Sequence, residues 1–191
     1  MRFDSSSDYF YKNLISAKEE FINWNCLNDS IMGGSSDACC KYTSDGLLIE
    51  GNLVEEGGGF ISCRSESFQP QINLKDYLGL ELNLDGRGKQ LKFAISTNDT
   101  FFGIKSFLPN SLKWVYTFET KSYGTTSVKI PFDKLEPNVR ARKYRLPVTF
   151  DRTSISRFQL LYSKFGSSGK SNSTFSSGRI SLLLRSISAY S

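Results

Sequence analysis

Hydrophobic and polar residues alternate with a period of two along most of this chain. The clearest example is "LGLELNLDGRGKQLKFAIS", in which inward positions recur at Leu78, Leu80, Leu82, Leu84, Leu91, Phe93 and Ile95. A residue pattern of period two is typical of β-strands with one buried face. The glycine-rich turn at 85–88 separates the two runs, so we predict a β-hairpin here.

The same alternation predicts further strands on both sides of this region. "CKYTSDGLLIEGNL" predicts two strands about a turn at 44–46. Four later segments show one apolar face each: "KWVYTFET" with Trp114, Tyr116 and Phe118, "TSVKIPF" with Val128, Ile130 and Phe132, "SRFQLLYSKF" with Phe158, Leu160 and Tyr162, and the final "GRISLLLRSISAY". Many short strands separated by Gly, Asn, Asp and Ser turns predict an all-β fold, an antiparallel β-sandwich or barrel.

Helical spacing is visible near the N-terminus. Phe10, Leu14 and Ile15 follow a cap at Ser7, so we predict a short amphipathic helix within 8–19. We therefore divide the chain into an N-terminal arm or short helix over 1–19 and a single β-sandwich domain over 20–191. The low-complexity segment 166–178 is predicted to be a mobile loop.

Composition adds limits on chemistry and location. Hydrophobic residues make up 39% of the 191, and aromatic residues 14%. There is no histidine, and the four cysteines Cys26, Cys39, Cys40 and Cys63 form no C-x-x-C pair. We expect reduced thiols, no zinc and no other metal or cofactor. No apolar run resembles a signal sequence or a membrane span, so we expect a cytoplasmic protein, with peripheral contact with a membrane left open.

The net charge of +5 suits an acidic partner, although plain soluble domains also carry such an excess. The densest basic run comprises Lys134, Arg140, Arg142, Lys143, Arg145, Arg152 and Arg157. Tyr144 lies inside this run and is available to stack on a base. An ordinary solvated face is the first interpretation of the run, and an RNA-binding face is the alternative.

Two glycine-rich segments are the most unusual feature. "NDSIMGG" ends in Gly33 and Gly34, and "GGGFISCR" contains Gly58 and Gly59 before a strand. Alternation places Phe60, Ser62 and Arg64 on one face of that strand. If that face is buried, the guanidinium needs a carboxylate, and Asp29 is the best candidate. We therefore hypothesise that the glycines make room for a buried Asp29–Arg64 ion pair that joins the two loops.

The sequence gives little support for a catalytic function. A Ser-His-Asp or Cys-His arrangement is excluded because histidine is absent. Glu50, Glu55 and Glu56 have no evident carboxylate opposite them, as a glycosidase would need. The glycine runs match neither G-x-G-x-x-G nor G-x-x-x-x-G-K-[ST]. We expect no enzyme activity.

The segments "W..LNDSIMGGSS", "G.L..EGGGFISCRS", "YLGLELNLDGRGKQLKFAI", "VKIPFDKLEPNVRAR" and "F..GRISLLLRSISAY" resemble the complex I intermediate-associated protein 30 family in order over residues 21–190. The resemblance implies a galactose-binding-like jelly-roll β-sandwich. It also implies a role in the assembly of a respiratory or photosynthetic membrane complex.

The motifs of this family map onto the chain position by position. From them and the basic run we predict these binding residues: Trp24, Asn28, Asp29, Met32, Gly33, Gly34, Gly58, Gly59, Phe60, Arg64, Arg87, Arg140 and Arg142. The first motif is matched by Trp24, Asn28, Asp29, Met32, Gly33 and Gly34, the second by Gly58, Gly59, Phe60, Ser62 and Arg64, and a DGR turn by Asp85, Gly86 and Arg87. The chain differs from the family pattern at Gly57, where members often have asparagine. It also differs at Ala141, between Arg140 and Arg142, where members have glycine. No catalytic residue is implied.

We interpret the protein as a non-enzymatic, chaperone-like assembly factor. It would bind protein subunits of a complex I or NDH-type intermediate through a surface that joins Trp24, Met32 and Phe60. An RNA-binding module that aids biogenesis of a membrane-complex subunit is the first alternative. A carbohydrate-binding module, with Trp114 exposed to a glycan, is the second.

Overall fold

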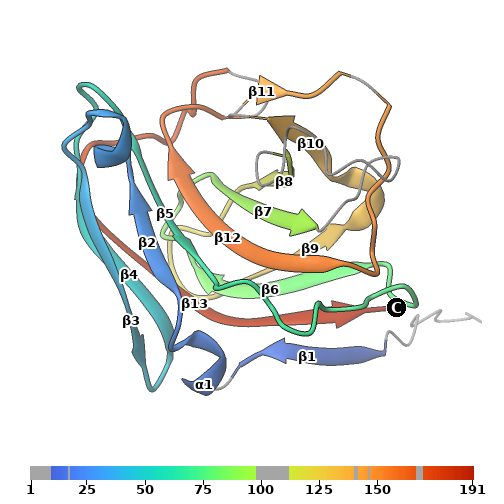
Figure 1. Cartoon of the computed structure of the whole chain (residues 1–191). Coiled ribbons are helices and arrows are strands. Elements are labelled where there is room, and N and C mark those ends of the chain that lie inside the picture. The colour runs from blue at the N-terminus through green and yellow to red at the C-terminus, as the bar shows by residue number, and fades with distance from the viewer. Residues whose placement is uncertain (1–9, 17, 98–111, 140–141, 146, 167–169) are drawn as a thin grey trace, which may run out of the picture.

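The computed structural model describes residues 10–16, 18–97, 112–139, 142–145, 147–166 and 170–191. In this part of the chain the strands form two antiparallel sheets, which Figure 1 shows as facing layers. The strands are β1 (Tyr11–Ile15), β2 (Asn25–Asn28), β3 (Asp37–Thr43), β4 (Gly46–Leu53), β5 (Phe60–Arg64), β6 (Gly79–Asp85), β7 (Leu91–Thr97), β8 (Leu112–Phe118), β9 (Thr126–Pro131), β10 (Glu136–Val139), β11 (Arg142–Lys143), β12 (Ile155–Ser163) and β13 (Gly178–Tyr190). The helical elements are α1 (Lys18–Phe21), η1 (Asp29–Met32) and η3 (Phe132–Lys134).

One sheet has the order β3-β4-β13-β6-β9, with β1 also paired to β13, and the other has the order β11-β10-β8-β7-β12-β5-β2. Inward side chains of both sheets form one core. Those that are 0% exposed include Leu80, Leu82 and Leu84 of the first sheet and Phe93, Ile95 and Phe158 of the second. The prediction of an antiparallel β-sandwich from alternating apolar positions is therefore confirmed.

The predicted hairpin over 78–96 is wrong in its pairing, although both strands exist. β6 pairs with β13 and β9, whereas β7 pairs with β12 and β8 of the opposite sheet. Turn residues 85–90 thus cross between the layers. A Cβ atom on Gly86 would lie 2.4 Å from the Thr120 side chain, so the crossing leaves no room for a larger residue there. Alternation specifies which face of a strand is buried, but it does not specify the neighbouring strand. The hairpin about 44–46 is confirmed, because β3 and β4 pair with Thr43 opposite Gly46.

The N-terminal segment also differs from the prediction. Residues 11–15 form β1, which pairs with the last strand so that Tyr11 lies opposite Tyr190. The short helix α1 begins only at Lys18. Tertiary pairing with β13 outweighs the weak helical periodicity, since short isolated helices are marginal in water.

The segment predicted as a mobile loop is held in place where it is described. Asn172 is 6% exposed, and its side-chain amide donates to the carbonyl oxygens of Ser163 at 2.9 Å and Gln90 at 3.1 Å. The hydroxyl of Tyr162 donates to the Thr174 carbonyl at 2.8 Å. Residues 167–169 of this segment lie outside the described residues.

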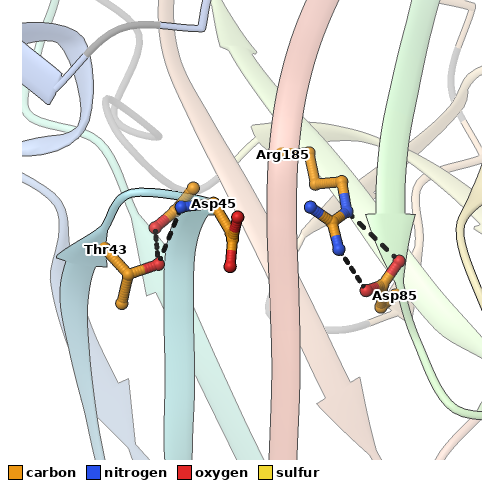
Figure 2. A network of polar contacts seen from close by, with 5 residues as sticks. Thr43, Asp45, Asp85 and Arg185 are labelled. Atoms are coloured by element: carbon orange, nitrogen blue, oxygen red, sulfur yellow. Dashed lines mark hydrogen bonds and ion pairs between the residues drawn. The ribbon is translucent and has the colours of Figure 1, made fainter.

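A bulge in β13 maintains the inward alternation over a long strand. The register with β6 shifts between Leu184 and Ser186, so Leu184 and Ile187 both point to the core. The extra residue, Arg185, points outward and binds Asp85, as Figure 2 shows. Its Nη2 atom lies 2.8 Å from the Asp85 Oδ2 atom. This hydrogen bond lowers the pKa of Asp85 and raises that of Arg185. The pair holds β6 against the bulged strand.

Candidate functional site

Asp29 forms the centre of the two glycine-rich loops. It is the first residue of η1 and is 0% exposed. Its Oδ2 atom accepts hydrogen bonds from the Gly59 amide at 2.7 Å, the Ser36 hydroxyl at 2.7 Å and the Phe60 amide at 3.3 Å. Its Oδ1 atom accepts one from the Ser36 amide at 2.9 Å. The carboxylate therefore joins the segment after η1 to the start of β5.

These uncharged hydrogen-bond donors change the pKa of the Asp29 carboxyl group. Burial by itself would raise the pKa of Asp29, but the Ser36 hydroxyl and the amides of Gly59, Ser36 and Phe60 more than offset it, and the pKa is lowered. A carboxylate that accepts several amide hydrogen bonds stays ionised without a cationic partner.

The glycines on either side of Asp29 provide space for it. A Cβ atom on Gly34 would lie 2.4 Å from the Asp29 Cγ atom, and one on Gly58 would lie 2.2 Å from its Oδ2 atom. Gly59 has φ of +99°, a left-handed conformation that favours glycine and directs its amide at the carboxylate. The hypothesis that the paired glycines make room for a buried polar contact is thus confirmed in its steric part.

The predicted partner of Asp29 is wrong. Arg64 forms no ion pair with it among the described residues, because the donors at Asp29 are the amides and the hydroxyl named above. Phe60, Ser62 and Arg64 do share a face of β5, but that face points away from the core. In this register Arg64 lies opposite Gln159 of β12 and Asn25 of β2. The sequence suggested a carboxylate partner for Arg64. It could not reveal that backbone amides would instead bind the buried carboxylate of Asp29.

The other members of the first motif divide between core and surface. Trp24 is 5% exposed, packs on Phe21 with ring centroids 5.8 Å apart, and donates to the Glu20 carbonyl at 3.1 Å. The predicted surface joining Trp24 to Met32 is therefore wrong on the Trp24 side. The Asn28 amide donates to the Ala38 carbonyl at 3.0 Å, which ties β2 to β3.

Apolar side chains are exposed next to the Asp29 site. Ile31 is 64% exposed and Met32 is 74% exposed, and both belong to η1. Gly33 ends this turn at φ of +88°, and a Cβ atom added to it would have no neighbouring atom within 4 Å. The Asp29 contacts fix the base of η1, so the two apolar residues are presented on a constrained segment.

Half-buried cations project from the side of the seven-stranded sheet that faces away from the core. One is Lys92 of β7, whose pKa is lowered by burial, and three others lie close together. Arg64 of β5, Lys113 of β8 and Arg157 of β12 are each half-buried, and we call them the cation cluster. Burial lowers the pKa of Lys113 to about 8, with further contributions from Arg64 and Arg157. Burial and Arg64 likewise lower the pKa of Arg157. Sequence reasoning missed Lys113 as part of a site, because the sheet order that brings it near Arg64 is not visible along the chain.

The remaining predicted arginines lie elsewhere. Arg87 is exposed in the turn that crosses between the sheets, and Arg142 is exposed on β11. Arg140 lies outside the described residues. The basic run is dispersed where it is described: Lys143 pairs with Glu136 at 2.7 Å, while Arg152 donates to the Tyr77 carbonyl at 3.1 Å. The run therefore does not form a single described patch for RNA.

The aromatic platform predicted for a glycan is absent at Trp114, which is 3% exposed and packs on Phe150 with centroids 5.3 Å apart.

Cysteine chemistry also differs from the expectation of reduced thiols. A disulfide joins Cys40 of β3 to Cys63 of β5 and thereby links the two sheets. Cys26 of β2 lies opposite Cys63, and its Sγ atom is 2.9 Å from that of Cys40. The three sulfur atoms lie within 4.8 Å of one another. While the disulfide is intact, Cys26 is the one member of this group of three that can offer a thiolate to a metal, and burial raises its pKa to about 12.

No helix in the described ranges has the length and apolar character needed to cross a membrane.

The architecture is that of a jelly-roll β-sandwich, and solved structures share it. A family 11 carbohydrate-binding module from Clostridium thermocellum, in complex with a β-1,3-1,4-mixed-linked tetrasaccharide, superposes with a TM-score of 0.63 at 16% identity, covering 94% of each chain. The family 11 module of the cellulosomal cellulase Lic26A-Cel5E of Clostridium thermocellum gives 0.62 at 17% identity, covering 96% of this chain and 95% of that one. An agarase gives 0.57 at 12% identity, covering 95% of this chain and 24% of its own. At these identities the likeness establishes the fold alone, and the predicted jelly-roll β-sandwich is confirmed.

Sequence comparison identifies the family. The chain belongs to the complex I intermediate-associated protein 30 (CIA30) family, whose model matches residues 14–182. The resemblance inferred from the glycine motifs is therefore confirmed. Comparison with the curated proteins finds no match.

Proposed function

We propose that the protein is a non-enzymatic assembly factor that holds a protein subunit of a respiratory or photosynthetic membrane complex, of the complex I or NDH type, before the complex is complete. The observation on which this proposal depends is the family match over residues 14–182, which spans both sheets and both glycine-rich loops.

The structure supports a binding role through η1. Ile31 and Met32 are exposed on a turn whose base is fixed by Asp29 and Gly59. Exposed methionine and aliphatic side chains suit adaptable contacts with protein surfaces, and a constrained segment loses less conformational entropy when it binds. We therefore assign η1 to contact with the client subunit.

The experiment is a gene deletion in the native host with complementation. Assembled complexes are separated on a native gel, and NADH dehydrogenase activity is measured in the gel. Deletion should lower the abundance of at least one such complex, and the wild-type gene should restore it. Normal abundance of every respiratory and photosynthetic complex after deletion would overturn the proposal.

A matched pair of variants tests the role of η1. A variant with Ile31→Ser and Met32→Ser should restore less of the complex than the wild type. Ile22→Ser is the control, because Ile22 is 61% exposed but lies outside η1. Equal restoration by both variants would exclude η1 as the contact.

A further inference from the structure

The cation cluster has a defined geometry within the seven-stranded sheet. Arg64 lies opposite Gln159, which lies opposite Ala94 of β7. Directly opposed residues project to the same side of a sheet, as do residues two apart on one strand. Arg157, two residues from Gln159, therefore projects to the same side as Arg64. Lys113 does so as well, because it is two residues from Val115, which lies opposite Ala94.

Small residues on β7 form the floor between the cations. Ala94 is 2% exposed, and Ser96 lies opposite Arg157. The Lys113 Nζ atom donates to the Gln159 Oε1 atom, so the lysine reaches from β8 across β7 to β12. Adjacent strands are about 4.8 Å apart, so the Lys113 side chain must pass over the whole of β7 to reach β12. Small residues on β7 leave room for it. The cationic groups thus converge over one part of the sheet.

The positive charge of this cluster is poorly neutralised. None of the ion pairs among the described residues includes Arg64, Lys113 or Arg157. Glu66 is the carboxylate whose field acts on Arg157. The Arg157 Nη2 atom donates to the Ser67 hydroxyl at 2.9 Å, but its Nε atom is buried and has no hydrogen-bond partner in the described structure. Half-buried cations held close together destabilise a fold, which favours a functional reason for their position.

The neighbours of the cluster favour a polypeptide over a nucleic acid. The rows of opposed residues that contain Arg64 and Ser62 also present Leu27, Leu161 and Val115, together with the charged Lys92 and Glu136, and these two rows contain no aromatic ring. Phe60 shares this face of β5 but lies one row further from Arg64, beyond Ser62. Proteins that bind single-stranded nucleic acids combine cations with aromatic rings on which bases stack. Cations beside aliphatic side chains instead suit an acidic protein segment, whose carboxylates pair with the cations while apolar residues contact the aliphatic ones.

We propose that Arg64, Lys113 and Arg157 form a binding site for carboxylate side chains of an acidic segment of the client protein. This inference rests on the proposed function and names the chemistry of the partner. The carboxylates would supply acceptors to the guanidinium groups, including the unpaired Arg157 Nε–H, and would offset the mutual repulsion of the cations.

Fluorescence anisotropy tests the site with defined probes. The full chain is titrated into a fluorescein-labelled peptide of alternating glutamate and serine, a matched peptide with glutamine in place of glutamate, and labelled oligouridine. The glutamate peptide should bind about tenfold more tightly than the glutamine peptide, and its affinity should fall with salt. Equal affinity for the two peptides, or preference for oligouridine, would overturn the inference.

Single variants locate the binding. Arg64→Gln, Lys113→Gln and Arg157→Gln should each weaken the glutamate peptide about fivefold to tenfold. Arg179→Gln is the control, because it removes the same charge from an exposed position on β13 in the other sheet. An equal loss in the control would show nonspecific attraction and overturn the site. Amide shifts of Ala94, Ser96 and Gln159 in the wild type on peptide addition test the site without any substitution, and their absence at saturation would also overturn it.

The two proposals fail separately. Absence of peptide binding with an assembly defect on deletion would overturn only the acidic-peptide site. Normal abundance of the membrane complexes after gene deletion would overturn the assembly function, whether or not the protein binds the glutamate peptide.

Discussion

The carboxylate of Asp29 accepts a 2.7 Å hydrogen bond from the amide of Gly59, thirty residues later in the chain. This contact joins two loops that are each rich in glycine. It requires a left-handed backbone conformation at Gly59 and the absence of a side chain at Gly58, where a Cβ atom would meet the carboxylate. The local backbone is therefore organised around an acidic group that solvent does not reach.

Replacement of Asp29 should strongly destabilise the fold. Asp29→Ala leaves the Ser36 and Gly59 amides buried without an acceptor, and we expect a loss of about 3 kcal/mol in the free energy of unfolding, measured in urea. Asp29→Asn should lose less, since one oxygen acceptor remains. An unchanged urea midpoint for Asp29→Ala would contradict this account.

The Asp29 carboxylate also predicts that the folded protein loses stability in acid. Because its pKa is lowered in the folded state, the unfolded chain binds the proton first as pH falls. The stabilisation is complete above the ordinary aspartate pKa of 3.8 and is lost as pH falls below it through the folded value. The stability difference between wild type and Asp29→Asn should therefore shrink in acid. A difference that stayed constant down to the lowest pH at which the wild type folds would argue against an ionised Asp29.

The glycines should differ in their tolerance of side chains. Gly58→Ala places a Cβ atom against the Asp29 carboxylate, and we expect it to cost about 2 kcal/mol through overpacking. Gly33→Asn is the control, because that position has a left-handed φ but open space, and asparagine tolerates this conformation. Thermal unfolding of both variants measures the difference. Equal melting temperatures would show that space at Gly58 is not limiting.

Removal of the charge at Lys113 should stabilise the free protein. Lys113→Met removes a half-buried cation that Arg64 on β5 and Arg157 on β12 repel. Loss of the hydrogen bond that Lys113 donates to the buried Gln159 offsets part of this gain, so we expect a net gain of less than about 1 kcal/mol at neutral pH. The folded wild type releases this proton near pH 8, whereas the unfolded chain keeps it to about 10.5. Wild-type stability should therefore rise with pH across that window, relative to the variant. Urea unfolding of the wild type and of Lys113→Met, below and above pH 8, tests this prediction. If the difference between their free energies of unfolding does not decrease as pH rises, the prediction is wrong.

Thiol reactivity should distinguish the four cysteines. Cys39 is exposed and free, whereas Cys26 is half-buried with its pKa raised to about 12, so Cys39 should react rapidly with a disulfide reagent and Cys26 slowly. Cys40 and Cys63 should react only after reduction. Cys39→Ser should remove the fast phase alone. Rapid reaction of all four thiols without reductant would show that the disulfide is absent.

Reduction of this disulfide should also lower stability. It closes a loop with a sequence separation of 23, for which chain entropy gives about 3 kcal/mol.

The sequence predicted what depends on local pattern and failed where distant partners decide. Alternation identified the inward faces of β6, β7 and β12, because burial on one side of a strand repeats every second residue. It did not show that β6 and β7 belong to different sheets, since a turn can lead to a neighbouring or a facing strand. Helical spacing at Phe10 and Leu14 was misleading because an unpaired edge of β13 was available to the segment.

Site predictions followed the same division. The glycine motifs marked the Asp29 loops correctly, since only an unusual backbone needs so many small residues. The predicted partner of Asp29 was wrong because backbone amide donors occur at every residue except proline, so a sequence does not indicate which of them will bind a given carboxylate. The cation cluster was invisible because Arg64, Lys113 and Arg157 come together only through the order of the strands.

The pairing of β1 with β13 places the first and last described strands side by side, with the Ser191 amide donating to the Phe10 carbonyl at 3.1 Å. Tension applied at residues 10 and 191 would therefore open this pair from one end, one hydrogen bond after another, instead of shearing all of its bonds at once. The load would fall first on the pairing of β1 with the end of β13, so the mechanical resistance of the domain would begin with a short strand that is exposed over most of its length.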